Sequence, residues 1–554
     1  MSASSKKKLR KAQEAEKLTE KQLTEQKEAK KLKIYTTVFV VVLALMIVAA
    51  VWIAVSNTIA HNGVRERGTT ALTVGEHEIS NAELNFFYID AVNNFYSQYG
   101  SYASLFGLDT TLPLNEQVTD EETGATWADD FLNSAKENAR AVYALADEAK
   151  AQGYTLSDEE KAEIETHLSN LSLYASYYGY SNAEDYLKAM YGNGATEKTY
   201  RAYAELTSLA SSYETYYADS LVYDDAALRE AESENYAEYS SFSYNTYYLS
   251  TSKFLEGGTT DDEGNTTYSD EEKAASVTAA EEAAKALAEG EYASVADLDA
   301  AIAALEINAE TEGAASTTYE DTAYASINSV VQEWVTDESR VSGDVTYIAS
   351  TTHTHAEGET HSDDEDSSEY ETVNGYYVVY YVGTNDNTFA LANVRHILVA
   401  FEGGTTDDNG NTTYSDEEKA AAKDEADAIL ADWKAGEATE DSFAALANEK
   451  SDDGDGTTGG LYEDVYPGQM VTNFNDWCFD ESRKAGDTDV IETEYGYHVM
   501  YYVGDSETNY RDYQIINTLK SADTDAWFNA LIEPMTVTEL NTDYISKDLV
   551  LTNG

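Results

Sequence analysis

The stretches RHILV, at residues 395–399, and YGYHV, at residues 495–499, each place one histidine in a short apolar run. Runs rich in Val, Ile, Leu and Tyr predict strands, in which alternate side chains point to the same face of a sheet. The acidic element S-D-D lies between them at residues 451–453. The sequence thus predicts a sheet that carries His396 and His498, with a carboxylate and an apolar pocket nearby.

These elements resemble, in order and spacing, the parvulin family of peptidyl-prolyl isomerases over about 115 residues. Besides the two histidine stretches, the matching motifs are FAALA at residues 443–447, a glycine pair at 459–460 and GQMV at residues 468–471. The family pairs two central histidines. The resemblance therefore implies an α+β isomerase domain at residues 390–505.

The resemblance also implies which residues form the site. It gives catalytic roles to His396, Asp453 and His498, and substrate-binding roles to Tyr462, Met470 and Phe474. The chain departs from the family at residues 459–463, where it reads GGLYE and the family typically reads GGDLG. Tyr462 thereby takes the place of a leucine, which changes the loop beside the pocket.

A prolyl isomerase needs no nucleophile, cofactor or metal. The X–Pro bond favours trans by only about 0.5–1 kcal/mol, but its rotation barrier is near 20 kcal/mol because amide resonance must be broken. An apolar pocket can seat the prolyl ring while a fixed polar network stabilises the twisted amide. No cofactor is therefore expected. Cys478, between two aromatic residues, is expected in the core and not in a covalent step.

An internal repeat precedes and includes this domain. Residues 256–275 and 402–421 are identical at all but one position, and a second pair of similar blocks follows in the same order, at 375–383 and 496–504. Two blocks in the same order predict a duplicated α+β domain with an antiparallel sheet, whose first copy occupies residues 241–386.

The first copy lacks both histidines. Tyr377 stands at the position of His498, and the opening strand at residues 247–251 contains no histidine. We expect this degenerate copy to keep the fold without catalysis. It would then serve as a spacer or as a peptide-binding surface.

Residues 69–240 predict a mostly helical chaperone domain. Ser80, Ser157 and Ser181 each stand three residues before a glutamate, which is the spacing of a helix capping box. The region is rich in tyrosine, which is typical of surfaces that bind varied polypeptides and also of helix-packing cores. Residues 506–554 are too few for a domain, so we expect a short amphipathic helix that packs on the N-terminal helices.

The N-terminus predicts a membrane anchor. Residues 1–33 form a basic tail with 11 Lys and Arg against 5 Asp and Glu, and the 22 residues 34–55 carry no charge. As a helix this run is about 33 Å long, enough to cross the hydrocarbon core, and the basic flank places the N-terminus in the cytoplasm. We expect a single-pass protein of the cell membrane with its bulk outside the cytoplasm. A cleaved secretory signal is the alternative interpretation.

Composition excludes several other classes. The 554-residue chain has 35 Lys and Arg against 103 Asp and Glu, and its net charge of −68 argues against nucleic acid as a partner. Its single cysteine excludes a disulfide framework and a Cys-based zinc cluster. His353, His355 and His361 give a weak zinc or nickel pattern, for which a solvated acidic loop is the alternative. The calcium-like acidic turns lack the terminal glutamate of a calcium loop, so no metal site is predicted.

The sequence therefore predicts an α+β multidomain protein that resembles exported foldases of the PrsA/SurA type. Its expected partners are unfolded or newly exported polypeptides with X–Pro bonds. Its expected activity is prolyl isomerisation combined with chaperone function. The alternative hypothesis is a non-catalytic holdase or scaffold of the cell envelope, in which both parvulin-like copies are inactive folds.

Overall fold

The computed structural model divides the chain into two compact units. One contains Met1–Leu221 together with Ser521–Gly554, and the other contains Val222–Lys520. The structure describes residues 3–15, 46, 62–309, 311, 313–353, 371–407, 410–454 and 456–551. The predicted membrane span at residues 34–55 lies outside the described residues apart from Met46. None of the helices described is long and apolar enough to cross a bilayer.

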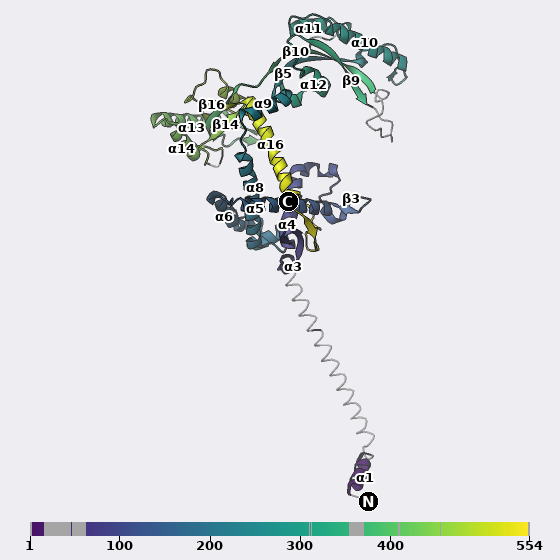
Figure 1. Cartoon of the computed structure of the whole chain (residues 1–554), viewed down its shortest axis with the longest axis vertical. Coiled ribbons are helices and arrows are strands. Elements are labelled where there is room, and N and C mark those ends of the chain that lie inside the picture. Colours follow the sequence, from purple (N-terminus) through teal and green to yellow (C-terminus); the bar gives the residue numbers. More distant parts are fainter. Residues whose placement is uncertain are drawn as a thin grey trace. The chain divides into compact units, whose positions relative to one another are not determined.

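The first unit is built mainly from helices (Figure 1). Its main helices are α4 (Asn81–Tyr99), α5 (Trp127–Ala151), α6 (Asp158–Tyr177), α7 (Ala183–Tyr191) and α8 (Glu197–Ser220). Its shorter elements are α1 (Ala3–Ala15), α3 (Val64–Gly68), β1 (Thr70–Val74), β2 (His77–Ser80), η1 (Gly100–Phe106), η2 (Leu114–Glu116), β3 (Val118–Asp120) and β4 (Ala125–Thr126). The apolar faces of α4, α5 and α7 converge on one core that contains Phe86, Phe131 and Leu187.

Side-chain caps set where the helices of this unit begin. Ser157 and Glu160 form a full capping box at the start of α6. The predicted box at Ser181 is wrong by one residue, because Asn182 caps α7 and accepts the Asp185 amide. An asparagine side chain satisfies the same free helix amide as a serine, so the two adjacent candidates compete for one role.

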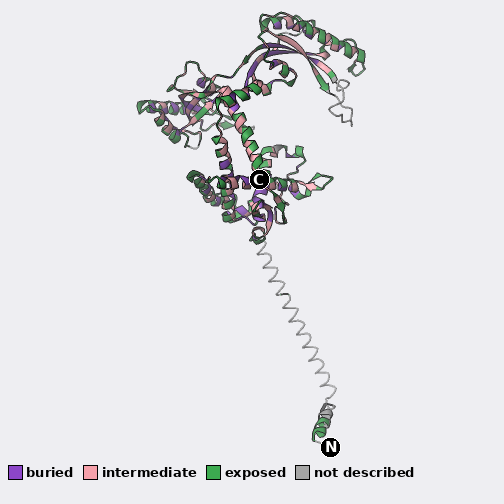
Figure 2. Ribbon diagram, viewed as in Figure 1, coloured by how far each residue is buried: buried purple, intermediate pink, exposed green. Residues whose placement is uncertain are grey.

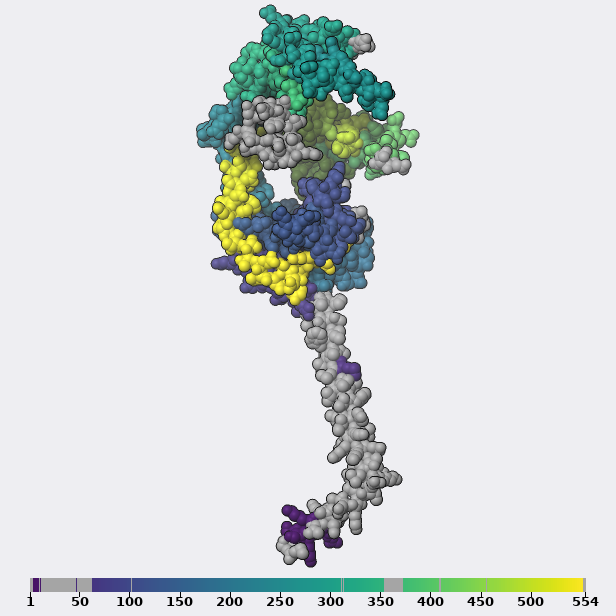
Figure 3. Space-filling model, turned by 90° about the vertical axis from the view of Figure 1, so that its right-hand side faces the viewer, coloured from purple at the N-terminus to yellow at the C-terminus, as the bar shows by residue number. Residues whose placement is uncertain are grey.

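Both ends of the described chain contribute to the first unit. The strand β17 (Val537–Glu539) pairs antiparallel with β1, which also pairs with β2. Ile545 is buried in the same core as the N-terminal helices. Figure 3 shows C-terminal residues, in yellow, against the blue and purple surface of this unit. The fold of this unit therefore depends on residues from beyond the isomerase-like region.

The C-terminal segment forms a longer helix than the sequence predicted. The helix α16 runs from Tyr510 to Ile532, a length of 23 residues. No Gly or Pro interrupts this stretch, and Pro534 follows it. Because glycine and proline are the residues that most disfavour a helix interior, nothing in the local sequence ends the helix earlier.

The second unit contains two four-stranded antiparallel sheets. Their strand orders are β8-β5-β10-β9 and β14-β11-β16-β15. The strands are β5 (Ser241–Ser250), β8 (Thr317–Ala323), β9 (Val345–His353), β10 (Glu371–Asn385), β11 (Ala390–Ala400), β14 (Leu461–Val465), β15 (Thr488–Glu492) and β16 (Gly496–Asn509). Each strand of the first sheet has a counterpart at the same place in the second, which is the structural form of the sequence repeat.

Helices cover both faces of each sheet. Figure 1 shows α10 and α11 on one side of the first sheet and α12 on the other, and Figure 2 shows buried residues, in purple, along the strands of that sheet. The helices of this unit are α9 (Asp225–Glu234), α10 (Asp270–Ala288), α11 (Val295–Ala303), α12 (Ser329–Val335), α13 (Asp416–Ala435), α14 (Glu440–Lys450) and α15 (Thr472–Cys478). In the first sheet α10 and α11 cover one face and α12 covers the other. In the second sheet α13 and α14 cover one face and α15 covers the other.

The two near-identical sequence blocks fold into the same hairpin and capped helix. The hairpin strands are β6 (Thr259–Thr260) with β7 (Thr266–Thr267), and β12 (Thr405–Thr406) with β13 (Thr412–Thr413). In the second copy Glu418, part of the capping box of α13, also accepts the Gly404 amide at 2.9 Å. Glu272 accepts the Gly258 amide at the same distance in the first copy. One carboxylate thus fastens each hairpin to its helix.

Candidate active site

His396 and His498 lie on the two central strands of the second sheet. In the register of β11 and β16, His396 is opposite Met500 and Leu398 is opposite His498. Residues two apart on a strand share a face, so both histidines point to the same side of the sheet. This is the side that α15 covers with Phe474, and the histidines therefore lie between the sheet and that helix.

The two imidazoles form the centre of a buried polar network. His396 Nδ1 lies 3.0 Å from His498 Nδ1, and His396 Nε2 lies 3.2 Å from Asp453 Oδ2. On the other side, His498 Nε2 lies 2.9 Å from Thr493 Oγ1. The two histidines are 3% and 5% exposed, whereas the Asp453 side chain is 40% exposed. The network therefore reaches solvent at its carboxylate end.

The charge at one end of the network sets the direction of its hydrogen bonds. The Asp453 carboxylate lies 3.2 Å from His396 Nε2, and its negative charge favours the tautomer of His396 that carries its proton on Nε2 and leaves Nδ1 bare. His498 then donates from Nδ1 and accepts the Thr493 hydroxyl proton at Nε2. Each group donates toward Asp453.

Both imidazoles are neutral at pH 7. Burial lowers the pKa of His396 to about 4, in spite of the attraction of the Asp453 carboxylate. Burial also lowers the pKa of His498 to about 4, and the neighbouring His396 contributes to this lowering. Neutral rings can share a hydrogen bond between their Nδ1 atoms, whereas two imidazolium ions would present only donors to each other.

Three hydrogen bonds after α14 hold Asp453 at the site. Ser451 Oγ accepts the Leu398 amide at 3.1 Å, and Asp452 Oδ2 accepts the Ala400 amide at 2.9 Å. The Asp452 amide donates to the Leu398 carbonyl at 2.8 Å. This part of β11 lies beyond its pairing with β14, so its free edge accepts the loop. The first two residues of S-D-D thus position the third.

The glycine pair before β14 allows a close approach of two backbones. The His396 amide donates to the Gly460 carbonyl at 2.9 Å. A Cβ atom on Gly460 would lie 2.1 Å from the His396 carbonyl oxygen, and Gly460 has a φ of 63°. A larger residue here would displace the strand that carries His396.

Tyr462 covers the outer side of the network. Its hydroxyl donates to Asp453 Oδ2 at 2.9 Å, and its ring stacks on the His396 imidazole with the centroids 4.8 Å apart. Burial, together with the Asp453 carboxylate, raises the pKa of Tyr462 to about 12, so the phenol remains a donor at neutral pH. Tyr462 was expected from the resemblance as a substrate-binding residue, and the structure adds its bond to Asp453.

Phe474 and Met470 supply the apolar part of the site. The Phe474 ring is edge-on to both imidazoles, with centroids 5.5 Å from those of His396 and His498. The Tyr462 ring lies 6.3 Å from Phe474. Met470 is partly buried and packs on the cluster that contains Phe474. Five of the expected residues thus share direct hydrogen bonds or ring contacts, and Met470 joins them through the apolar cluster.

Thr493 is the site residue that the sequence did not reveal. It lies in the turn before β16, is 7% exposed, and accepts the Tyr495 amide at 3.2 Å besides bonding to His498. A single threonine near the start of a strand carries no motif. The only available signal was its position five residues before a histidine.

The described residues of the first copy form no equivalent network. In the register of β5 and β10, Thr246 and Tyr377 stand where His396 and His498 stand in the second copy. The Tyr377 hydroxyl instead accepts a long bond of 3.4 Å from the Asn328 side chain. An imidazole has two ring nitrogens, so it can accept a hydrogen bond on one side and donate one on the other. The single hydroxyl groups of Thr246 and Tyr377 cannot form such a chain across a ring.

Two other groups that the sequence singled out are Cys478 and the histidine pattern at residues 353–361. Cys478 is buried, and burial raises the pKa of its thiol to about 12. The histidine pattern at residues 353–361 lies outside the described residues apart from the backbone of His353. Within the part of the chain that the structure describes, no three His, Cys, Asp or Glu side chains are grouped to hold a metal ion.

The sheet order, the helices on both faces and the buried histidine pair form an α+β domain of the kind that the parvulin resemblance predicted. Residues 376–504 match the family model described as the PPIC-type PPIase domain. This part of the chain is therefore similar to parvulin-type peptidyl-prolyl isomerase domains. The match begins in β10, before the predicted domain start at residue 390.

Several solved structures resemble the chain over about a quarter of its length. The PPIase domain of TbPar42 is 25% identical with a TM-score of 0.17, and the match covers 20% of this chain and 98% of that one. Peptidylprolyl isomerase PrsA from Bacillus anthracis is 19% identical with a TM-score of 0.17, over 27% of this chain and 59% of that one. PrsA from Bacillus subtilis is 25% identical with a TM-score of 0.16, over 26% and 46%. The match thus spans about half of each PrsA chain, and no curated protein matches.

Proposed function

We propose that this chain is a membrane-anchored, extracytoplasmic peptidyl-prolyl isomerase that also holds unfolded polypeptides. The observation that carries the catalytic part is the neutral pair of His396 and His498, 3.0 Å apart, beside the edge of Phe474. This arrangement places a preorganised polar network next to an apolar wall, which is what rotation about an X–Pro bond requires.

The reaction needs the prolyl ring to be held while the preceding carbonyl rotates. We assign Phe474 and Met470 to the contact with the ring. Tyr462 lies at the mouth of the site with 36% of its surface exposed, where it can contact the residue before proline. The network holds Asp453 and both imidazoles in place before the substrate arrives, so little reorganisation is needed as the amide twists.

The other parts of the chain extend the proposal. The uncharged run at residues 34–55 would anchor the protein, with residues 1–33 in the cytoplasm. The helical unit would hold newly exported polypeptides. The first parvulin-like copy, with Thr246 and Tyr377 in place of the histidines, would keep the fold without catalysis.

An isomerase assay on a proline-containing peptide tests the proposal. We expect kcat/KM to fall at least tenfold in His396→Ala, His498→Ala and Asp453→Ala, with the circular dichroism spectrum retained. Unchanged turnover in all three variants would reject the assigned site. Thr246 and Tyr377 of the first copy stand at the positions of His396 and His498, which favours a second function, that of a holdase. Suppression of aggregation by a wild-type chain that shows no prolyl turnover would support that alternative.

A further inference from the structure

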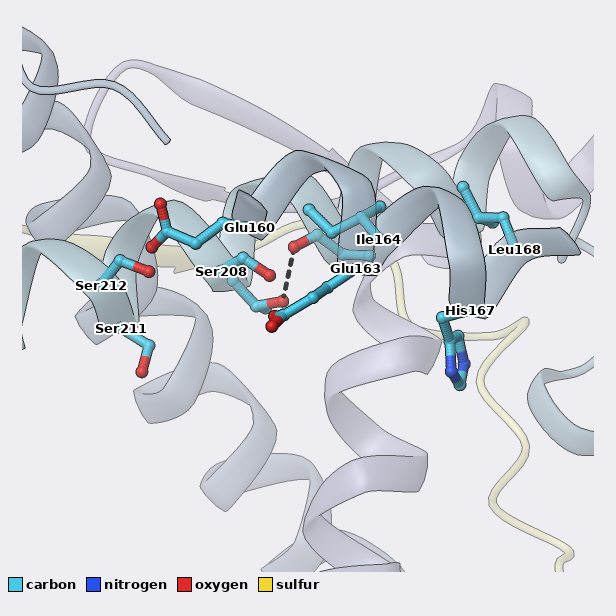
Figure 4. A pocket seen from close by; sticks show the side chains of 10 residues that line it. Glu160, Glu163, Ile164, His167, Leu168, Ser208, Ser211 and Ser212 are labelled. Atoms are coloured by element: carbon cyan, nitrogen blue, oxygen red, sulfur yellow. Dashed lines mark hydrogen bonds between the residues drawn. The ribbon is translucent and has the colours of Figure 1, made fainter. Parts of the chain in front are cut away.

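The helical unit contains a groove between α6 and α8 (Figure 4). Its volume is about 520 Å³, which is within the range of sites that bind ligands. The floor is apolar, with Ile164 and Leu168 from α6 and Ala204 from α8. None of the residues of the isomerase site lines it.

One wall of the groove is a stripe of hydroxyl groups. The helix α8 contributes Thr207, Ser208, Ser211 and Ser212 to the lining. Serine and threonine are weaker helix formers than alanine or leucine, by roughly 0.5 kcal/mol each. Their small side chains fill little of the space between the helices, so the groove stays open and lined with hydrogen-bonding groups.

The opposite wall carries two carboxylates with different surroundings. Glu160 is held by hydrogen bonds from Ser157 and Ser212, which lower its pKa, and it closes one end of the groove. Glu163 lies nearly one turn further along α6, and in Figure 4 its side chain extends toward the helix that carries Ser208, Ser211 and Ser212. Among the residues that the structure describes, none forms an ion pair or hydrogen bond with the Glu163 side chain.

The other end of the groove is closed by a fixed aromatic ring. His167 Nε2 lies 3.0 Å from the Tyr200 hydroxyl, and the ring also packs near Tyr174 with centroids 5.9 Å apart. No Lys or Arg is among the lining residues. An apolar floor, a hydroxyl wall and an unpaired carboxylate thus lie together in one groove.

We propose that this groove binds a lysine or arginine side chain of an unfolded polypeptide. The aliphatic stem would lie on Ile164 and Leu168, and the charged head would reach Glu163 and the hydroxyl of Ser208. Charge complementarity selects this occupant, because the lining offers negative charge and hydrogen-bonding oxygens but no cation. The inference rests on the proposed holding function and adds the chemistry that the helical unit recognises.

Binding of dye-labelled peptides to the full chain, measured by fluorescence anisotropy, tests the inference. The probe is a proline-free peptide with several apolar residues and one lysine. The control peptide has the same sequence with norleucine in place of lysine. We expect Glu163→Gln to weaken binding of the lysine peptide about tenfold, through loss of a charge-assisted hydrogen bond. Glu159→Gln removes the same charge from an exposed position of α6 outside the groove, and it should leave binding unchanged.

A second variant tests the geometry separately from the charge. Ser208→Leu fills the groove without changing its charge. It should weaken binding of the lysine peptide as strongly as Glu163→Gln does. The inference would be overturned if the lysine and norleucine peptides bound equally well, or if Glu159→Gln weakened binding as much as Glu163→Gln. It would also be overturned if spermidine bound as tightly as the lysine peptide. Prolyl turnover is measured on the same proteins. Loss of turnover with binding still dependent on Glu163 would reject only the catalytic part of the proposed function.

Discussion

The hydroxyl of Tyr462 and the imidazole of His396 meet the same oxygen, Oδ2 of Asp453, at 2.9 Å and 3.2 Å. The carboxylate is thus held from two sides, by a phenol that covers it and by a ring that stacks on that phenol. The parvulin resemblance implied a leucine at this position. The bond from the Tyr462 hydroxyl to Asp453 is therefore one that the resemblance did not predict.

Removal of the Tyr462 hydroxyl should lower turnover. Tyr462→Phe keeps the ring on His396 but loses the bond to Asp453, so we expect kcat/KM to fall about three- to tenfold. Tyr462→Leu also loses the stacked ring, so its kcat/KM should fall further. Tyr495→Phe, at a residue 59% exposed in the same domain, is the control and should not change turnover. Full activity of Tyr462→Phe would show that Asp453 needs no second donor.

Thr493 should reinforce the tautomer of His498. Thr493→Val keeps the side-chain shape but removes the donor to Nε2, so only the bond to His396 Nδ1 still favours the tautomer of His498 with its proton on Nδ1. We expect about a tenfold loss in kcat and a changed nitrogen chemical shift of His498 by NMR. Thr493→Ser retains the hydroxyl and should restore both. A normal His498 tautomer in Thr493→Val would contradict this role.

The histidine pair should titrate only in acid. The pKa of each histidine is lowered from its ordinary value of about 6.5 to about 4. Turnover should therefore stay level from pH 8 to about pH 5.5 and fall below about pH 5, with the two ring proton NMR signals moving in the same range.

The same shift predicts a loss of stability in acid. The unfolded chain takes up protons near pH 6.5, whereas the folded pair resists protonation until about pH 4. The pair's contribution is thus fully present above pH 6.5 and is lost as the pH falls to about 4. Chemical denaturation across this pH range should show that the free energy of unfolding falls less in the double variant His396→Gln, His498→Gln than in the wild type. An identical pH dependence in both proteins would argue against neutral buried histidines.

Gly460 should be intolerant of a side chain. Gly460→Ala introduces a Cβ 2.1 Å from the His396 carbonyl at a positive φ, and we expect the free energy of unfolding to fall by about 2–4 kcal/mol. Gly454→Ala is the matched control, since Gly454 also has a positive φ but open space around it. It should lose only about 1–2 kcal/mol, the cost of the left-handed backbone alone. Equal losses in the two variants would mean that the close approach carries no strain.

Local sequence patterns predicted much of what surrounds the site. Short apolar runs predicted the two strands that carry His396 and His498, and serine caps marked helix starts, since both signals come from residues that are close in sequence. Where two neighbouring residues compete for one role the pattern was less exact, as when Asn182 and not Ser181 capped α7. The length of α16 was underestimated because amphipathic periodicity marks only the part of a helix that meets a core.

Contacts between distant residues were decided only by the tertiary structure. The sequence offered Asp453 and two histidines, but the order of donors along Thr493, His498, His396 and Asp453 depends on a strand register and on a loop fastened to β11. The bond from Tyr462 likewise needs β14 beside β11. Residue types and their spacing are known from the sequence. The direction of hydrogen bonds and the burial of side chains arise only when separate strands pack together and exclude water.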